Sequence, residues 1–206
     1  MLTRFRKASG RGLILTTALL LILIYLLKGV RGRLSETLAR KDGSLKEITV
    51  EASDFEMSGL REDGEGWHTT DNDPQMIYRL DSKLSKVSFT MTWTLEPGEI
   101  VMYYMEEGDI GFSPSKRVWA KPTAGDGYEF SMPMKKVTYV RIDPTMYPAN
   151  HLEFSPITFN RPSGVSGYFR PEASDFFELI IYTGIISSLL RYLQGILPER
   201  KEEEKG

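Results

Sequence analysis

KVSFTMTWTL, residues 86–95, is the stretch that decides the fold. Every second residue in it is apolar, from Val87 to Leu95, and the residues between them are Ser or Thr. A period of two is typical of a β-strand that buries one face, and β-branched threonines favour the half-exposed other face. The stretch therefore predicts a strand whose Trp93 belongs to the core.

Further short strands are expected on both sides of this segment. They cover residues 46–52, 99–105, 118–121, 128–132, 137–142 and 152–159, and the 99–105 strand is expected to be the hairpin partner of 86–95 across Pro97-Gly98. Turn-forming residues separate them, and Gly59–Asp73 is expected to be a loop because Gly, Asp and Glu dominate it. The pattern predicts a mostly β fold, an antiparallel, jelly-roll-like β-sandwich over residues 45–160.

A long uncharged segment, Gly12–Leu27, lies near the N-terminus between two basic clusters. As a helix, residues 12–30 would measure about 28 Å, close to the ~30 Å hydrocarbon core of a bilayer. This predicts a transmembrane anchor within residues 1–33. A cleaved signal peptide is the alternative, but no A-x-A site follows the apolar core. A buried core helix is disfavoured by the flanking charges.

The charges around the anchor give its expected orientation. The first cluster holds Arg4, Arg6, Lys7 and Arg11, and the second holds Lys28, Arg31, Arg33, Arg40 and Lys41. The two clusters nearly balance under the positive-inside rule. The signal-like layout favours a cytoplasmic N-terminus and an extracytoplasmic sandwich.

Four further segments complete the expected organisation. A polar stalk covers residues 34–44, a linker 161–174, a hydrophobic or amphipathic helix 175–197 and a charged tail 198–206. Three interpretations of the 175–197 helix remain open. It is an amphipathic helix at the bilayer surface or against the anchor, it is a second span with Gly184 and Ser188 as a small-residue contact face, or it covers the sandwich.

Composition excludes several functions. Residues 34–174 hold 15 basic and 22 acidic residues, a net charge of −7, which argues against a nucleic-acid partner. The chain has no cysteine and no recognisable catalytic motif, so we expect no enzyme and no cofactor. His68 and His151 are its two histidines, 83 residues apart and without a carboxylate at zinc-ligand spacing, so no metal site is expected. A hydrolase would require Asp73, Glu106 and Asp109 to converge.

Aromatic side chains are the better candidates for a binding site, because sugars stack their C–H faces on exposed rings while polar groups meet the hydroxyls. The glycan-binding candidates are Trp67, Tyr103, Tyr104, Trp119, Tyr128 and Arg141. One of Tyr103 and Tyr104 must point inward, because neighbours on a strand face opposite sides. Core packing is the alternative role for each aromatic. Arg141 is expected to pair with Asp143 or Asp73.

Four segments, read in order, carry a resemblance. They are Gly66-Trp67 leading to Asp73–Tyr78, Gly111–Pro114, Phe130–Pro133, and Val140–Pro144 followed by Leu152–Phe159. Together they resemble the carbohydrate-binding-like, jelly-roll β-sandwich appended to bacterial glycosyltransferases and cell-surface polysaccharide assembly proteins. The resemblance covers about residues 46–160, and no glycosyltransferase domain accompanies it in this sequence.

The resemblance and the anchor together predict a membrane-anchored, non-catalytic accessory protein. It would bind or position glycan during assembly of envelope polysaccharide or glycolipid. Its expected partners are the bilayer, a glycan and a polytopic membrane protein such as a glycosyltransferase. The alternative is a structural subunit of a membrane complex, with the two apolar helices for docking and the sandwich as a protein-binding surface.

Overall fold

The computed structural model describes residues 9–171 and 173–196. The chain forms two units: a β domain, Ser35–Pro162, and a helical unit made by the chain before and after it. Two parts of the expected organisation lie outside the described residues. They are Arg4, Arg6 and Lys7 of the first basic cluster, and the charged tail 198–206.

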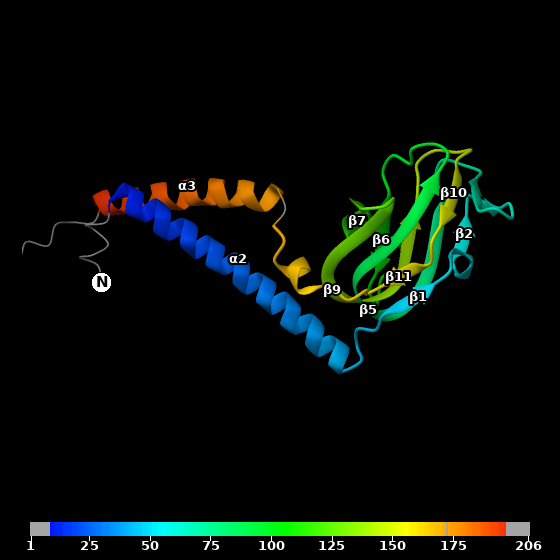
Figure 1. Cartoon of the computed structure of the whole chain (residues 1–206), viewed down its shortest axis with the longest axis horizontal. Coiled ribbons are helices and arrows are strands. Elements are labelled where there is room, and N and C mark those ends of the chain that lie inside the picture. The colour runs from blue at the N-terminus through cyan, green and yellow to red at the C-terminus, as the bar shows by residue number, and fades with distance from the viewer. Residues whose placement is uncertain (1–8, 172, 197–206) are drawn as a thin grey trace, which may run out of the picture. The chain divides into compact units, whose positions relative to one another are not determined.

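The β domain is built from eleven strands, and every strand pair is antiparallel. The strands are β1 (Ile48–Val50), β2 (Glu56–Ser58), β3 (Leu60–Glu62), β4 (Trp67–Thr69), β5 (Gln75–Trp93), β6 (Val101–Met105), β7 (Arg117–Trp119), β8 (Lys121–Thr123), β9 (Gly127–Asp143), β10 (His151–Phe154) and β11 (Ile157–Phe159). Their main path runs β3-β4-β10-β5-β9-β6-β7, while β1 and β2 join through β11 and β5 (Figure 1). The mostly β, antiparallel fold is confirmed.

Two long strands, β5 and β9, organise the domain. They pair from Met76↔Ile142 to Thr90↔Gly127, with two irregularities in register. At one of them, Ser85 alone faces the segment Met132–Met134, which contains Pro133. A proline has no N–H to give to the ladder and is tolerated where the ladder is interrupted. The prediction that Pro133 separates two strands was therefore wrong, because the bulge accommodates it within one.

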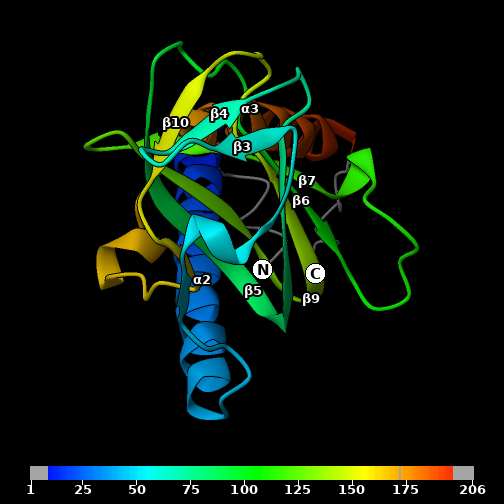
Figure 2. The same cartoon turned by 90° about the vertical axis from the view of Figure 1, so that its right-hand side faces the viewer.

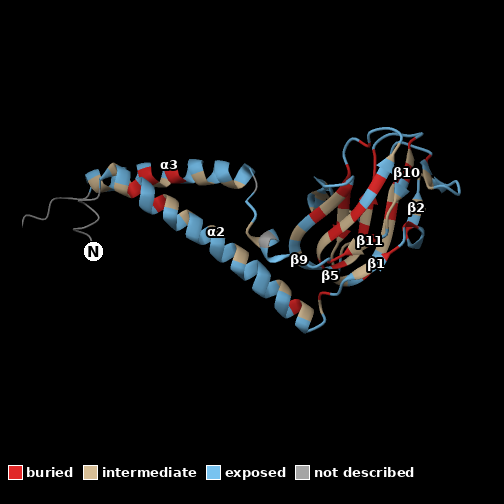
Figure 3. Ribbon diagram, viewed as in Figure 1, coloured by how far each residue is buried: buried red, intermediate tan, exposed pale blue. Residues whose placement is uncertain are grey.

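The core lies where the inward faces of these strands meet, as the red bands on β5, β6 and β9 show in Figure 3. Its largest fully buried side chains include Phe130, Phe159, Met76, Leu84, Met91, Met102, Ile142 and Leu152. Within 86–95, Val87, Phe89 and Met91 are buried and Trp93 packs against the core, as the alternation predicts. Leu95 lies beyond the end of β5 and is half exposed.

Three further expectations about strands were wrong. The Gly59–Asp73 segment contains β3 and β4 in addition to turns, because a tight turn at Asp63–Gly66 lets the two strands pair. The β6 strand pairs with β7 and β9 rather than with β5. The 152–159 segment is divided at Ser155-Pro156 into β10 and β11, which pair with different stretches of β5. Figure 2 shows β3, β4 and β10 side by side.

The first helix, α2, covers Gly10–Lys41, so helix continues through most of the expected stalk. The last turn of α2 belongs to the β domain, where the Arg40 guanidinium donates a hydrogen bond to the Asn160 carbonyl oxygen at 2.6 Å. Glu36 accepts from the same guanidinium at 2.6 and 2.9 Å. The helix therefore ends against β-domain backbone.

The second helix, α3 (Ala173–Ile196), follows the short 3₁₀ helix Val165–Tyr168. The start of α2 and the end of α3 lie together (Figure 1). A Cβ on Gly10 would lie 2.7 Å from the Arg191 side chain. Buried residues of α3 are Thr183 and Ser187, one turn apart, whereas Gly184 and Ser188 are exposed. The small contact face thus lies one residue from the predicted one.

Both helices are long and apolar enough to cross a membrane, by length and composition. Their large apolar side chains are mostly exposed, including Phe177 at 69% and Ile180 at 71%.

Candidate functional site

One face of the β domain presents aromatic and arginine side chains in register. Tyr103 on β6 pairs with Arg141 on β9 and with Arg117 on β7. Tyr139, two residues before Arg141, shares the face and pairs with Arg79 on β5, and Trp119 lies two residues after Arg117. We call this surface the Tyr103 face; it consists of Arg79, Tyr103, Arg117, Trp119, Tyr139 and Arg141.

Each arginine of the Tyr103 face contacts an aromatic ring of the same face. The guanidinium carbon lies 4.3 Å from the ring centroid for Arg117 and Trp119, 5.1 Å for Arg141 and Tyr103, and 5.9 Å for Arg79 and Tyr139. These distances are within the range of cation–π contacts. The three pairs hold the rings in place over neighbouring strands.

Carboxylates hold two of the arginines. Arg141 donates to both oxygens of Asp143, at 2.7 and 2.8 Å, and to Asp73 at 2.9 Å. Arg79 donates to Asp81 at 2.7 Å. Arg141 was expected to pair with Asp143 or Asp73, and it pairs with both. These contacts join two of the motifs that carry the family resemblance.

Burial and neighbouring charges shift the pKa of Arg141, and that of Asp143, in opposite directions. Burial lowers the pKa of Arg141, but the hydrogen bond and charge of Asp143, with the charge of Asp73, outweigh it and raise that pKa above its ordinary value. Burial raises the pKa of Asp143 above its ordinary value, against the opposing effect of Arg141. Arg141 therefore stays charged and its side chain is held in one place.

The exposed groups of the Tyr103 face suit a polar ligand that also has an apolar side. The Trp119 side chain is 47% exposed, Tyr103 and Tyr139 are partly exposed, and Arg79 and Arg117 face solvent. Rings offer apolar area, and guanidinium N–H groups and carboxylate oxygens offer donors and acceptors.

The structure separates the six predicted glycan-binding residues. Tyr103, Trp119 and Arg141 come together on the Tyr103 face. Tyr104 points to the opposite side, is buried, and lies under the Lys135 ammonium at 5.5 Å. Tyr128 packs against Phe89 and Trp93 at 5.9 and 6.0 Å between centroids, and Trp67 packs on the core from β4.

Three residues of the Tyr103 face were not predicted from the sequence: Arg79, Arg117 and Tyr139. Tyr139 could have been found, because it stands two residues before Arg141 in an alternating strand and so shares its face. Arg79 and Arg117 could not have been found from the sequence, because their neighbours across the sheet depend on the pairing of β5 with β9 and of β6 with β7.

The acidic residues proposed for a hydrolase are used in ion pairs. Glu106 and Asp109 share Lys116, at 3.1 and 2.6 Å, and Glu106 also pairs with Lys135 at 2.8 Å. Asp73 pairs with Arg141 instead. Hydrogen bonds from Lys135 and Lys116 hold the pKa of Glu106 below its ordinary value, and Lys116 does the same for Asp109. These carboxylates are paired for charge balance rather than set apart as an acid and a base.

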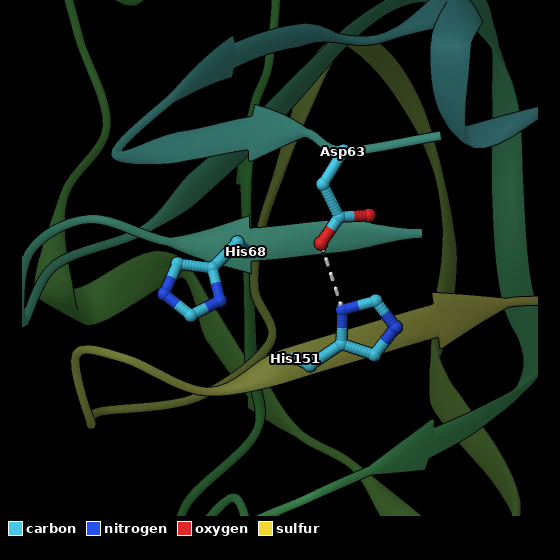
Figure 4. A group of neighbouring side chains, drawn as sticks. All are labelled: Asp63, His68 and His151. Atoms are coloured by element: carbon cyan, nitrogen blue, oxygen red, sulfur yellow. Dashed lines mark hydrogen bonds and ion pairs between the residues drawn. The ribbon is translucent and has the colours of Figure 1, made fainter. Parts of the chain in front are cut away.

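The two histidines, far apart in sequence, are direct neighbours across the sheet. His68 on β4 and His151 on β10 form a register pair, and Asp63 from the β3–β4 turn lies beside them (Figure 4). The distance of 83 residues along the chain does not separate them, because β4 and β10 pair.

Neither a protein-family model nor a curated protein matches this sequence. Three solved structures that are similar are carbohydrate-binding modules. A low-affinity xylan-binding module, CBM86, from Roseburia intestinalis is 12% identical, with a TM-score of 0.37, and the match covers 58% of this chain and 97% of that chain.

The other two belong to CBM6. A β-1,3-glucan-binding module from Bacillus halodurans is 13% identical, with a TM-score of 0.36 over 57% of this chain and 97% of that one. CsCBM6-3 from Clostridium stercorarium, in complex with cellobiose, is 7% identical, with a TM-score of 0.31 over 58% and 95%. At such identities and scores no ligand-binding position is transferred from these modules to this chain.

Proposed function

We propose that this protein is a membrane-anchored, non-catalytic glycan-binding accessory protein in cell-envelope polysaccharide or glycolipid assembly. The observation that supports it is the Tyr103 face, where three partly exposed rings and three arginines lie in register over four neighbouring strands. The family resemblance of the sequence points to the same class of ligand.

A sugar ring has both the apolar side and the polar groups that suit the Tyr103 face. Its C–H side packs on Trp119 or Tyr103, and its hydroxyl groups exchange hydrogen bonds with Arg117, Arg141 and Asp73. Arg141 is already held by two carboxylates, so little side-chain entropy is lost when it binds. Rings held by arginines are likewise ordered before the ligand arrives.

The membrane part of the proposal rests on the helical unit. Apolar side chains of α2 and α3 are exposed along helices of 32 and 24 residues, and hydrocarbon would cover them in a bilayer. We propose that both helices span, that the N-terminus is cytoplasmic and that the β domain is extracytoplasmic.

The test is a glycan array probed with the full chain in detergent micelles, compared with the Trp119→Ala and Tyr103→Ala variants. Loss of one stacking ring is expected to weaken binding of the selected glycan at least tenfold, about 1.4 kcal/mol or more. Arg117→Ala is expected to weaken it less, since it removes donors and ring support but no ring.

Arg61→Ala, an exposed arginine on β3 outside the Tyr103 face, is the matched control for Arg117→Ala and is expected to bind as the wild type does. Binding that survives Trp119→Ala and Tyr103→Ala but is lost in Trp67→Ala or Tyr128→Ala would place the glycan elsewhere. No binding to any glycan by the folded protein would refute the proposal.

A second candidate function is a docking subunit of a membrane complex, and one observation favours it. Between α2 and α3 lies an apolar groove of about 480 Å³, lined by residues such as Leu21, Tyr25, Phe169, Phe176 and Tyr182. A helix of a polytopic partner would fill it. Photo-crosslinking from Phe176 in membranes would capture such a partner, while Trp119→Ala would leave the capture unchanged.

A further inference from the structure

Asp63, His68 and His151 form a cluster outside the Tyr103 face. One ligand atom from each lies within 4.8 Å of the other two, and Asp63 Oδ2 is 3.1 Å from His151 Nδ1 (Figure 4). In tetrahedral coordination with bonds of about 2.1 Å, ligand atoms stand about 3.4 Å apart. Small movements of half-exposed side chains would therefore close the cluster around an ion.

Two paired strands position the imidazoles. His68 and His151 are direct register partners on β4 and β10, so their Cβ atoms lie on the same side of the sheet at neighbouring positions. This spacing comes from backbone pairing and does not depend on any side-chain contact.

The β3–β4 turn positions the carboxylate. Asp63 Oδ1 accepts hydrogen bonds from the backbone N–H groups of Gly66 and Glu65, at 3.0 and 3.2 Å, which leaves Oδ2 directed at His151. Gly66 allows the turn to approach β10 closely, because a Cβ there would lie 2.6 Å from the Leu152 carbonyl oxygen and 3.1 Å from His151 Cε1. The turn is thus built to bring the carboxylate to the imidazole.

A second carboxylate stands behind one imidazole. Glu153 Oε1 lies 3.7 Å from Nε2 of His151, on the side away from Asp63. An outer carboxylate that takes the N–H of one ring nitrogen leaves the other nitrogen free to bind metal, the usual arrangement at histidine metal ligands. At 3.7 Å this contact is longer than a hydrogen bond, so Glu153 would act as a positioning residue that presents Nδ1 of His151 after a small side-chain rotation.

From this geometry we propose that Asp63, His68 and His151 bind a divalent cation of the Zn²⁺ class. Two imidazole nitrogens and one carboxylate oxygen suit such an ion, whereas Mg²⁺ and Ca²⁺ prefer oxygen ligands. Three protein ligands leave the fourth position open to solvent. The bound ion would tie the β3–β4 hairpin to β10. The proposal is independent of glycan binding at the Tyr103 face.

The test uses the full chain in detergent micelles, purified without a histidine tag and labelled with ¹⁵N-histidine. Because the sequence has two histidines, both imidazoles are observed without interference. Titration with Zn²⁺ is expected to shift both rings together at one equivalent, with Nδ1 of His151 as the ligating atom. Mg²⁺ is expected to shift neither.

Variants separate a built site from chance binding by surface imidazoles. Calorimetry is expected to show a loss of at least tenfold in Zn²⁺ affinity in His68→Gln, His151→Gln and Asp63→Asn. Glu65→Gln, in the same turn but outside the cluster, is the matched control and is expected to keep the affinity. Glu153→Gln is expected to shift the His151 tautomer in the apo spectrum and to weaken binding about tenfold.

Two results would overturn the proposal: a response from one imidazole alone, or an Asp63→Asn variant with wild-type Zn²⁺ affinity. Retained thermal unfolding temperatures in the absence of metal would show that the variants are folded. Glycan binding by the same variants is expected to be unchanged.

Discussion

Asn160 is a residue on which several parts of the β domain depend. Its side chain is buried, accepts from the Ser85 backbone N–H at 2.9 Å, and donates to the carbonyl oxygens of Lys83 and Lys46 at 2.8 and 3.0 Å. Its own carbonyl oxygen receives the hydrogen bond from Arg40. The side-chain amide thus joins β5 to the approach to β1, and the backbone carbonyl of the same residue joins them to the end of α2.

Asn160→Ala is expected to lower the free energy of unfolding by about 3 kcal/mol, because it leaves buried backbone groups without partners. Asn160 also has φ of 56°, a left-handed conformation that Asn tolerates better than Ala. For a chain of this size the unfolding temperature should fall by about 10 °C. Circular dichroism melts against Asn72→Ala, an exposed asparagine, check this; equal melting of the two variants would contradict it.

At the scale of elements, strand positions were largely predictable and strand partners were not. The 86–95 strand was visible because Val87, Phe89 and Met91 alternate with Ser and Thr. Its extension back to Gln75 was hidden by Asp81, Ser82 and Lys83, which lie at and after the bulge and break the alternation. The pairing of β4 with β10, which brings His68 to His151, depends on contacts between distant segments that no local pattern encodes.

Two carboxylates between β6 and β7, Glu106 and Asp109, are expected to make the stability of the protein depend on pH. Hydrogen bonds from Lys135 and Lys116 lower the folded-state pKa of Glu106, and one from Lys116 lowers that of Asp109, relative to their ordinary values of 4.5 and 3.8. Carboxyls with depressed pKa contribute stability above their unfolded pKa, and this contribution is lost as pH falls through the folded pKa. The protein should therefore lose stability between about pH 5 and pH 3.

Lys116→Met identifies the source of that loss. It is expected to destabilise the protein near pH 6, and the difference from the wild type should shrink as pH falls toward about 3, where the carboxyls are protonated. Melting curves of both proteins over this range measure it. A difference that stays constant with pH would show that Lys116 acts through packing alone.

At the scale of the whole molecule, the expected topology is a helical hairpin with the β domain between its two helices. If α2 and α3 both span, residues at the start of α2 and at the end of α3 lie on the same side of the membrane, and the β domain lies on the other. The sequence has no cysteine, so single cysteines report accessibility without background.

Ser9→Cys and Gly195→Cys are expected to react with a membrane-impermeant maleimide from the cytoplasmic side, and Ser58→Cys from the outer side. Labelling of intact cells followed by permeabilised cells measures this. If Gly195→Cys reacts together with Ser58→Cys in intact cells, α3 lies at the outer surface and does not span.

The pairing of β1 with β11 has a consequence for how such a chain can be rebuilt. Ile48 and Phe159 are register partners, so the first strand of the β domain begins and its last strand ends at points about 5 Å apart. A domain with neighbouring termini can be inserted into another protein, or exchanged, without parting the segments that flank it. A transferred β domain would need to keep Asn160 and the last turns of α2 with the strands, because Asn160 bonds to Arg40, Lys46 and Ser85.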